Sequence, residues 1–183
     1  MEAFAETEAL TPQLLRRALG AFATGVAVIG ARGPDGVLVG MTANSFTSVS
    51  LNPPLVLFCA ARSLSAFDVY CSASHFSANV LPVHGEAMSD HFARPGSAKW
   101  RTVPHAIGTT GVPLLDFAIV SFECQVVTRH EAGDHLIVMG QAVRLRMSDG
   151  GEPLVFFRSR YRQLDLTTMP VEPQAELPFL VWG

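Results

Sequence analysis

Side chains that can hydrogen-bond a ligand are concentrated in one segment, residues 40–54, which directly follows an apolar run. The hydroxyl and amide residues of this segment are Thr42, Asn44, Ser45, Thr47, Ser48, Ser50 and Asn52. A loop of this kind can offer hydroxyl and backbone N–H donors to a bound small molecule. A polar turn whose Asn and Ser side chains bond their own backbone is the alternative, and composition alone does not separate the two.

A second polar group, Arg62, Ser63 and Ser65, precedes a short apolar stretch with helical spacing. An arginine beside hydroxyls and the free N–H groups of a helix N-terminus can bind a phosphate. Ser65 also stands three residues before Asp68, which resembles the spacing of a capping box. Helix capping by Ser65, with a solvated Arg62, is therefore the simpler alternative.

Motifs for nucleophilic, metal-dependent or nucleotide-loop chemistry do not occur in the sequence. There is no GxSxG, HExxH, Walker A loop or GxGxxG after a strand. His130 and His135 are separated by a predicted turn, so we predict no metal site. The cysteines are odd in number and each has apolar neighbours, which predicts reduced core thiols. They are Cys59, Cys71 and Cys124.

Apolar periodicity predicts one leading helix followed by short strands. Thr11 is placed to cap a helix that begins at Pro12. Its apolar face consists of Leu14, Leu15, Ala18, Leu19 and Phe22. The predicted strands span residues 26–30, 37–41, 55–59, 76–81, 118–128, 135–147 and 154–157. Turns at 33–36 and 131–134 predict hairpins.

Residues 118–128 carry the clearest alternation in the chain. Val120, Phe122, Cys124 and Val126 share one face, while Ser121, Glu123 and Gln125 lie on the other. This predicts a half-buried antiparallel strand. A short helix after Ser65 and an irregular or briefly helical excursion at 89–100 interrupt the strands. Because no βαβ spacing occurs, the pattern favours an antiparallel barrel over a doubly wound sheet.

Composition excludes several classes of protein. The chain has 183 residues, of which 49% are hydrophobic and 16% charged, so it suits one compact domain. The net charge is −3 and Lys99 is the only lysine, so we expect no nucleic-acid partner. The apolar runs fall far short of the roughly 20 residues that span a bilayer, and residues 1–10 lack the features of a signal peptide. We therefore expect a cytoplasmic protein with no membrane partner.

Taken together, these stretches resemble the short-chain flavin reductase family over residues 14–164. The matching segments are residues 22–29 (FATGVAVI), 40–50 (GMTANSFTSVS), 53–56 (PPLV), 76–81 (FSANVL), 133–135 (GDH) and 161–164 (YRQL). The resemblance implies a mainly β fold, a six-stranded antiparallel split β-barrel of Greek-key type that binds FMN, with an N-terminal helix and short peripheral helices. We assign residues 10–166 to this domain and residues 167–183 to a C-terminal arm, whose apolar end we expect to dock on a partner subunit.

The resemblance also implies roles for particular residues. The cofactor-binding residues that it implies are Met41, Thr42, Ala43, Asn44, Ser45, Ser48, Arg62, Ser63, Ser65, Asn79, Val80, Arg158 and Tyr161. Residues 42–45 match the stretch along the isoalloxazine ring, and residues 62–65 match the phosphate end. His135 matches a histidine on the nicotinamide side and is the predicted catalytic residue.

The function that the resemblance implies is hydride transfer from NADH or NADPH to FMN or FAD, by a homodimer that supplies reduced flavin to a partner monooxygenase. Lack of a nucleophile motif agrees with this, because the cofactors carry hydride chemistry. One alternative is a flavoprotein with tightly bound flavin that acts directly on an organic substrate. Another is a non-enzymatic flavin-binding module, since a fold does not fix a function.

Overall fold

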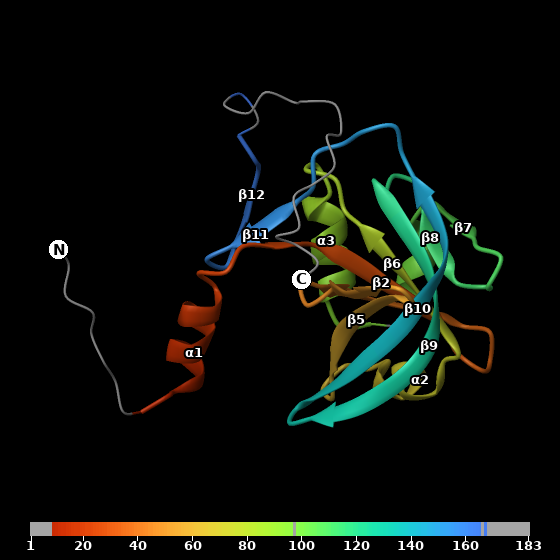
Figure 1. Ribbon diagram of the computed structural model, residues 1–183, viewed down its shortest axis with the longest axis horizontal. Coiled ribbons are helices and arrows are strands. Elements are labelled where there is room, and N and C mark those ends of the chain that lie inside the picture. Colours follow the sequence, from red (N-terminus) through yellow and green to blue (C-terminus); the bar gives the residue numbers. More distant parts are fainter. Residues whose placement is uncertain (1–8, 97, 166, 168–183) are drawn as a thin grey trace.

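The computed structural model describes residues 9–96, 98–165 and 167. Its main feature is a seven-stranded antiparallel sheet with the order β3-β2-β6-β9-β10-β5-β4 (Figure 1). These strands are β2 (Ala27–Arg32), β3 (Leu38–Ala43), β4 (Thr47–Leu51), β5 (Pro54–Ala61), β6 (His75–Val80), β9 (Val120–Ala132) and β10 (His135–Met147). The terminal strands β3 and β4 are not paired with each other within the described residues.

Shorter elements surround this sheet. The described residues contain the helices α1 (Pro12–Leu19), α2 (Phe67–Ser72) and α3 (Glu86–Ala93) and the 3₁₀ helix η1 (Lys99–Thr102). A three-stranded sheet has the order β1-β11-β12, formed by β1 (Thr24–Gly25), β11 (Val155–Phe157) and β12 (Arg160–Arg162). β7 (His105–Ile107) pairs with β8 (Pro113–Leu115). None of the described helices is both long and apolar enough to cross a membrane.

The predicted mainly β, antiparallel class is confirmed, and the described residues contain further strands beside the six expected for the barrel. β4 contains polar residues that we interpreted as loop, yet it pairs with β5 from Thr47 opposite Leu57 to Leu51 opposite Pro54. β1, β7, β8 and β12 have two or three residues each, which is too short to produce a periodic signal.

Both faces of the central strands are covered, and this corrects the reading of residues 118–128. One apolar cluster contains Phe58, Phe76 and Leu136. On the opposite face, a second cluster brings together residues of β2, α3, η1 and β8, namely Val28, Phe92, Trp100 and Leu115. Ser121 and Glu123, which we expected on an exposed face, are consequently buried.

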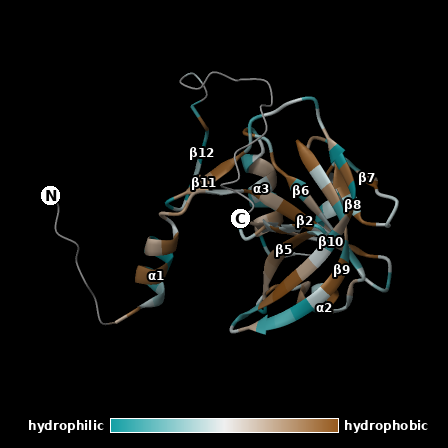
Figure 2. Cartoon of the chain, in the orientation of Figure 1, coloured by the Kyte–Doolittle hydropathy of each residue, from teal (hydrophilic) through white to brown (hydrophobic). Residues whose placement is uncertain are grey.

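The leading helix begins as predicted but stands apart from the main sheet, beside β11 and β12 (Figure 1). The Leu14 N–H donates to Thr11 Oγ1 over 3.2 Å, and Pro12 occupies the first turn. The helix ends at Leu19, so Phe22 lies beyond it, and no residue of α1 is buried. Figure 2 shows both apolar and polar colours on this exposed helix.

Two local predictions are wrong. The capping box at Ser65 does not form, because α2 begins at Phe67 with Ala66 at its N-cap and no side-chain cap bond. Among the cysteines, which are all free, Cys124 is buried and Cys59 half-buried, but Cys71 is exposed. Cys71 lies on the short helix α2, where a two-turn periodicity could not assign its face.

Candidate functional site

Three predicted residues from distant parts of the chain meet at one pocket of about 210 Å³. Thr42 and Asn44 lie at the end of β3, and Tyr161 lies on β12. The other lining residues are Val26, Ser89, Ala93 and Phe156. Hydroxyl and amide groups therefore stand beside apolar walls, which is the composition that binds a flat ring with a polar edge.

Hydrogen bonds to α3 fix the two sides of this pocket. Thr42 Oγ1 donates to the Ser89 carbonyl over 2.5 Å. The Tyr161 hydroxyl lies 2.9 Å from both Ser89 Oγ and Asp90 Oδ1. Burial raises the pKa of Tyr161, and the nearby Asp90 carboxylate acts in the same direction, so the phenol stays protonated and can donate.

Ser89 and Asp90 are residues of this site that sequence reasoning missed. They lie where we predicted an irregular or briefly helical excursion from residue 89; the structure has a helix there, which begins at Glu86 and ends at Ala93. Ser89 is fully buried. A serine in a short helix carries no local signal for such a contact, because its partners on β3 and β12 lie 47 and 72 residues away in the sequence.

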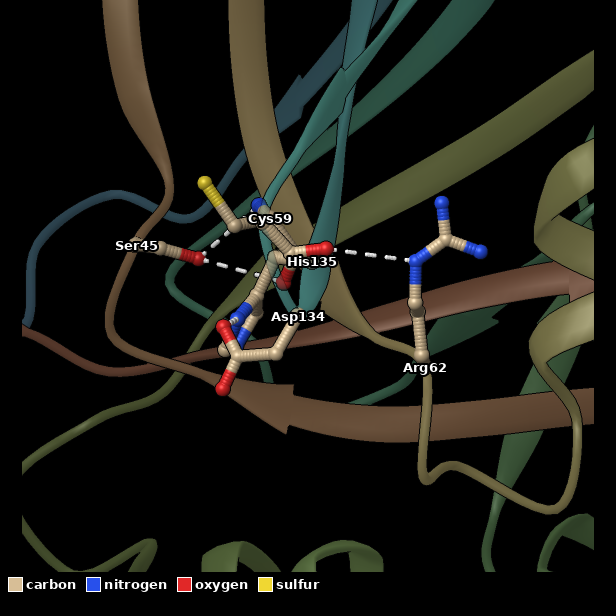
Figure 3. A network of polar contacts seen from close by, with 6 residues as sticks. Ser45, Cys59, Arg62, Asp134 and His135 are labelled. Carbon is tan, nitrogen blue, oxygen red and sulfur yellow. Dashed lines mark hydrogen bonds and ion pairs between the residues drawn. The ribbon is translucent and has the colours of Figure 1, made fainter.

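Ser45 and His135 lie in a second polar group, at the ends of β5 and β10 (Figure 3). Ser45 Oγ accepts from the Cys59 N–H over 3.0 Å and so ties the β3–β4 loop to β5. His135 follows a tight turn in which Gly133 has φ 63°, a conformation that suits glycine. Its Nδ1 lies 2.7 Å from Asp134 Oδ1.

The Asp134–His135 pair is accessible to a ligand, since the His135 side chain is 42% exposed. The hydrogen bond and the charge of His135 lower the pKa of Asp134. Asp134 therefore stays ionised and holds the ring through Nδ1, which leaves Nε2 free of any hydrogen bond to the described residues.

Arg62 fastens the β9–β10 turn to the end of β5. Its N–H donates to the Asp134 carbonyl over 2.9 Å, and its Nε donates to the Gly133 carbonyl over 3.3 Å. The guanidinium forms an ion pair with Glu131 and lies 5.5 Å from the Phe67 ring centroid. The exposed Ser63 and Ser65 follow in the turn before α2 and make no side-chain bond to its N-terminus.

Asn79 is placed away from both groups. Its side chain is fully buried, with Nδ2 donating to the Val28 carbonyl over 3.1 Å. Its Oδ1 accepts from the Leu115 N–H and the Ser121 hydroxyl over 3.0 and 2.9 Å. This network joins β2, β6, β8 and β9, so the predicted contact with a cofactor has no support from the geometry.

The remaining predicted residues are dispersed. Met41 and Ala43 are buried in the core, and Val80 is half-buried at the end of β6. Ser48 is exposed on the edge strand β4. Arg158 lies in the β11–β12 turn and lines a different hollow, beside α1. The described residues contain no group of three or more His, Cys, Asp or Glu that could hold a metal ion.

These elements define the class of this protein: a mainly β, antiparallel domain with a pocket at a strand end whose polar and apolar lining suits a small ligand. Residues 19–165 match the model of the flavin reductase like domain, so the chain belongs to this family. The resemblance given by the sequence motifs is thereby confirmed.

Individual relatives agree with this assignment. FMN reductase (NADH) SmoA of Agrobacterium fabrum is 43% identical over 141 residues, which cover 77% of this chain and 79% of that protein. The reductase component of the flavin-dependent trigonelline monooxygenase of Acinetobacter baylyi is 37% identical over 147 residues, or 80% of this chain and 47% of that protein. The structure of the NADH:FAD oxidoreductase SgcE6 of Streptomyces globisporus, solved with NAD and FAD fragments, has a TM-score of 0.82 and 34% identity, covering 89% of this chain and all of that one.

Proposed function

We propose that this protein transfers hydride from NADH to FMN or FAD and supplies the reduced flavin to a partner monooxygenase. Relatives that belong to the same family support each part: SmoA is named an NADH-dependent FMN reductase, SgcE6 an NADH:FAD oxidoreductase, and the Acinetobacter relative a monooxygenase reductase component. We also propose that β2, β3, β5, β6, β9 and β10 are the six strands of the split barrel.

The observation that carries the proposal is the convergence of Thr42, Asn44 and Tyr161 on one pocket. The residues present fit a flavin, because its ring system needs donors and acceptors along one edge and apolar contact on its faces. The Thr42 hydroxyl and the Asn44 amide supply the polar edge, while Val26 and Phe156 supply apolar surface. A bound flavin would supply the hydride acceptor; the protein binds, orients and excludes water.

His135 is the residue that we propose beside the nicotinamide. Asp134 fixes its ring through Nδ1, so Nε2 can hydrogen-bond a ligand in a defined orientation. Ser45 lies in the same group and holds the polar loop in place (Figure 3). Because the two cofactors carry the redox chemistry, the His135 and Ser45 side chains act by positioning the ligand.

The phosphate end of the flavin is proposed at Arg62, Ser63 and Ser65. Arg62 is engaged with Glu131 in the structure, but this pair is exposed. Exposed ion pairs contribute about 0 to 1 kcal/mol, so a phosphate can displace the carboxylate at little cost. The two hydroxyls make no bond to the start of α2 and are available as donors.

We propose that the protein is a homodimer that acts in the cytoplasm. The apolar face of α1 is uncovered in one chain: Leu15 and Leu19 are 45% and 64% exposed, and Phe22 just beyond the helix is 78% exposed. Such a cluster on a helix without buried residues favours contact with a second copy. The predicted docking of Phe179 and its neighbours in the C-terminal arm lies outside the described residues.

The direct test is oxidation of NADH and NADPH by the purified protein with FMN, FAD and riboflavin in parallel. We expect saturable oxidation that requires added flavin and is faster with NADH. A protein that keeps its flavin through purification and ignores added flavin would favour direct action on an organic substrate. Flavin binding without any NADH or NADPH oxidation would favour a binding module and contradict the proposal.

A further inference from the structure

A hollow of about 770 Å³ lies between α1 and the β11–β12 turn, apart from the pocket described above. Three arginines line it: Arg16 and Arg17 from the last turn of α1, and Arg158 from the β11–β12 turn. Ser159 and Gln13 add a hydroxyl and an amide. In Figure 1, α1 and the β11–β12 turn lie close together, apart from the main sheet.

Within the described residues, no acidic side chain forms an ion pair with these three arginines. Among the described residues, the side chains of Arg16, Arg17 and Arg158 make no hydrogen bond or ion pair, and the Arg158 guanidinium lies 5.2 Å from the centroid of the Phe157 ring. The whole chain has only 13 lysine and arginine residues and a net charge of −3. Three guanidinium groups around one hollow therefore form a local positive region on an acidic protein, which attracts an anion.

Helix stability explains part of this cluster but not all of it. Basic residues in the last turn of a helix interact favourably with its C-terminal carbonyls, which accounts for Arg16 and Arg17. Arg158 comes from a turn and lies 141 residues after Arg17 in the sequence. It is anchored to the end of α1 by its N–H, which donates to the Gly20 carbonyl over 2.8 Å.

The turn that presents Arg158 is conformationally costly. Arg158 and Ser159 have φ of 49° and 59°, in the left-handed region, where a turn of this kind favours Asn and Gly. This chain has Arg158 and Ser159 at these two left-handed positions, in place of Asn or Gly. Strained positions of this kind often serve a ligand site, and here they add a guanidinium and a hydroxyl to the hollow.

We propose that this hollow binds the diphosphate group of the nicotinamide nucleotide during hydride transfer, an inference that rests on the proposed function. Arginine binds phosphate oxygens through two parallel N–H donors, and several arginines match the charge of a diphosphate.

A charge interaction between Arg16 and the Asp134–His135 pair agrees with this assignment. The positive charge of Arg16 contributes to lowering the pKa of Asp134, after the larger effects of His135. Arg16 is therefore within electrostatic range of the Asp134–His135 pair, where the nicotinamide is proposed. The flavin phosphate has its own proposed partners at Arg62, so the arginines beside α1 are available to the hydride donor.

The first experiment measures the anion site alone, by calorimetric titration of the full chain with inorganic pyrophosphate. Two variants remove its charge: the double variant Arg16→Gln/Arg17→Gln, which keeps good helix formers, and Arg158→Asn, which suits the left-handed turn. Arg144→Gln is the matched control, an exposed arginine on β10 that does not line the hollow. Circular dichroism verifies that each variant is folded.

We expect Kd for pyrophosphate to rise about tenfold or more in both variants and to stay unchanged in the control. Absence of binding to the wild-type protein, or equal Kd values in all four proteins, would overturn the anion site. This titration needs no turnover, so its outcome is independent of whether the protein reduces flavin.

The second experiment identifies the source of the phosphate by steady-state kinetics. We expect Arg16→Gln/Arg17→Gln to raise KM for NADH about tenfold, with KM for FMN unchanged and no effect on a phosphate-free dihydronicotinamide donor. A rise in KM for FMN, with KM for NADH unchanged, would assign the hollow to the flavin phosphate and overturn the inference. A wild-type protein without flavin-dependent NADH oxidation would instead contradict the proposed function.

Discussion

Replacing Tyr161 by phenylalanine tests how the wall of the proposed flavin pocket is held. The phenol oxygen lies 2.9 Å from Ser89 Oγ and 2.9 Å from Asp90 Oδ1. Ser89 is fully buried, and its hydroxyl has no other side-chain partner among the described residues. The substitution therefore leaves a buried hydroxyl unsatisfied, which costs about 1 to 3 kcal/mol.

The contact with Asp90 adds little, because that carboxylate is exposed and screened by solvent. We expect a net loss of about 2 kcal/mol, which for a chain of this size lowers the melting temperature by about 4 to 8 °C. Thermal unfolding of Tyr161→Phe, Ser89→Ala and the double variant measures the coupling. The two effects should be clearly less than additive.

A loosened wall should also weaken flavin binding, because β12 and α3 both line the pocket. We expect KM for FMN to rise several-fold in Tyr161→Phe while the hydride-transfer rate at saturating flavin changes little. If Tyr161→Phe lowers the melting temperature by less than about 1 °C, or if the effects of Tyr161→Phe and Ser89→Ala are additive, the reasoning about Ser89 is refuted.

Three further predictions follow from single contacts. Burial raises the pKa of Glu123, but hydrogen bonds from Thr110 and Thr109 outweigh burial, so the net shift of this pKa is downward. The ionised Glu123 therefore stabilises the fold above the ordinary glutamate pKa, and this stability is lost as pH falls through the lowered pKa of the folded state. Glu123→Gln should consequently flatten the acid limb of a stability–pH profile. Gly140→Ala should destabilise the protein by about 1 to 3 kcal/mol in urea unfolding, because a Cβ there would lie 2.4 Å from Phe76 Cε1. His135→Ala should slow flavin reduction in stopped flow by about 1 to 3 kcal/mol of transition-state free energy, with flavin Kd nearly unchanged.

Each of these has an outcome that contradicts it. A Glu123→Gln profile parallel to the wild-type profile at acid pH would show that this carboxylate does not contribute. Gly25→Ala is the control for Gly140→Ala, because no atom lies within 4 Å of a Cβ at Gly25; equal losses would exclude overpacking. A wild-type reduction rate in His135→Ala would show that the ring does not reach the nicotinamide.

Local signals in the sequence predicted the elements that depend on residues close to one another in the sequence. The cap at Thr11 and the proline at Pro12 are both in place, and the strand predicted at 135–147 has the observed bounds of β10. The segment rich in hydroxyl and amide groups does reach a pocket through Thr42 and Asn44. These features depend on periodicity and turn chemistry within a few residues.

Features that depend on contacts distant in sequence could not be predicted in this way. Alternation in residues 118–128 identifies two faces but not what covers each, so the burial of Ser121 and Glu123 was missed. The Asn79 side chain is hydrogen-bonded to the Leu115 N–H and the Ser121 hydroxyl, and only the folded sheet brings these groups together. The contribution of Ser89 similarly requires α3 to lie against β3 and β12.

The measurement that tests the central claim most directly is flavin binding at the pocket of Thr42, Asn44 and Tyr161. Binding is monitored through the quenching of FMN fluorescence. Asn44 is exposed at this pocket, so Asn44→Ala removes a ligand-facing amide without disturbing the core. The account predicts saturable quenching by the wild-type protein and a Kd about tenfold higher for Asn44→Ala, as expected for loss of one or two hydrogen bonds. Equal Kd values for the two proteins, with both fully folded, would contradict the claim that this pocket binds the flavin.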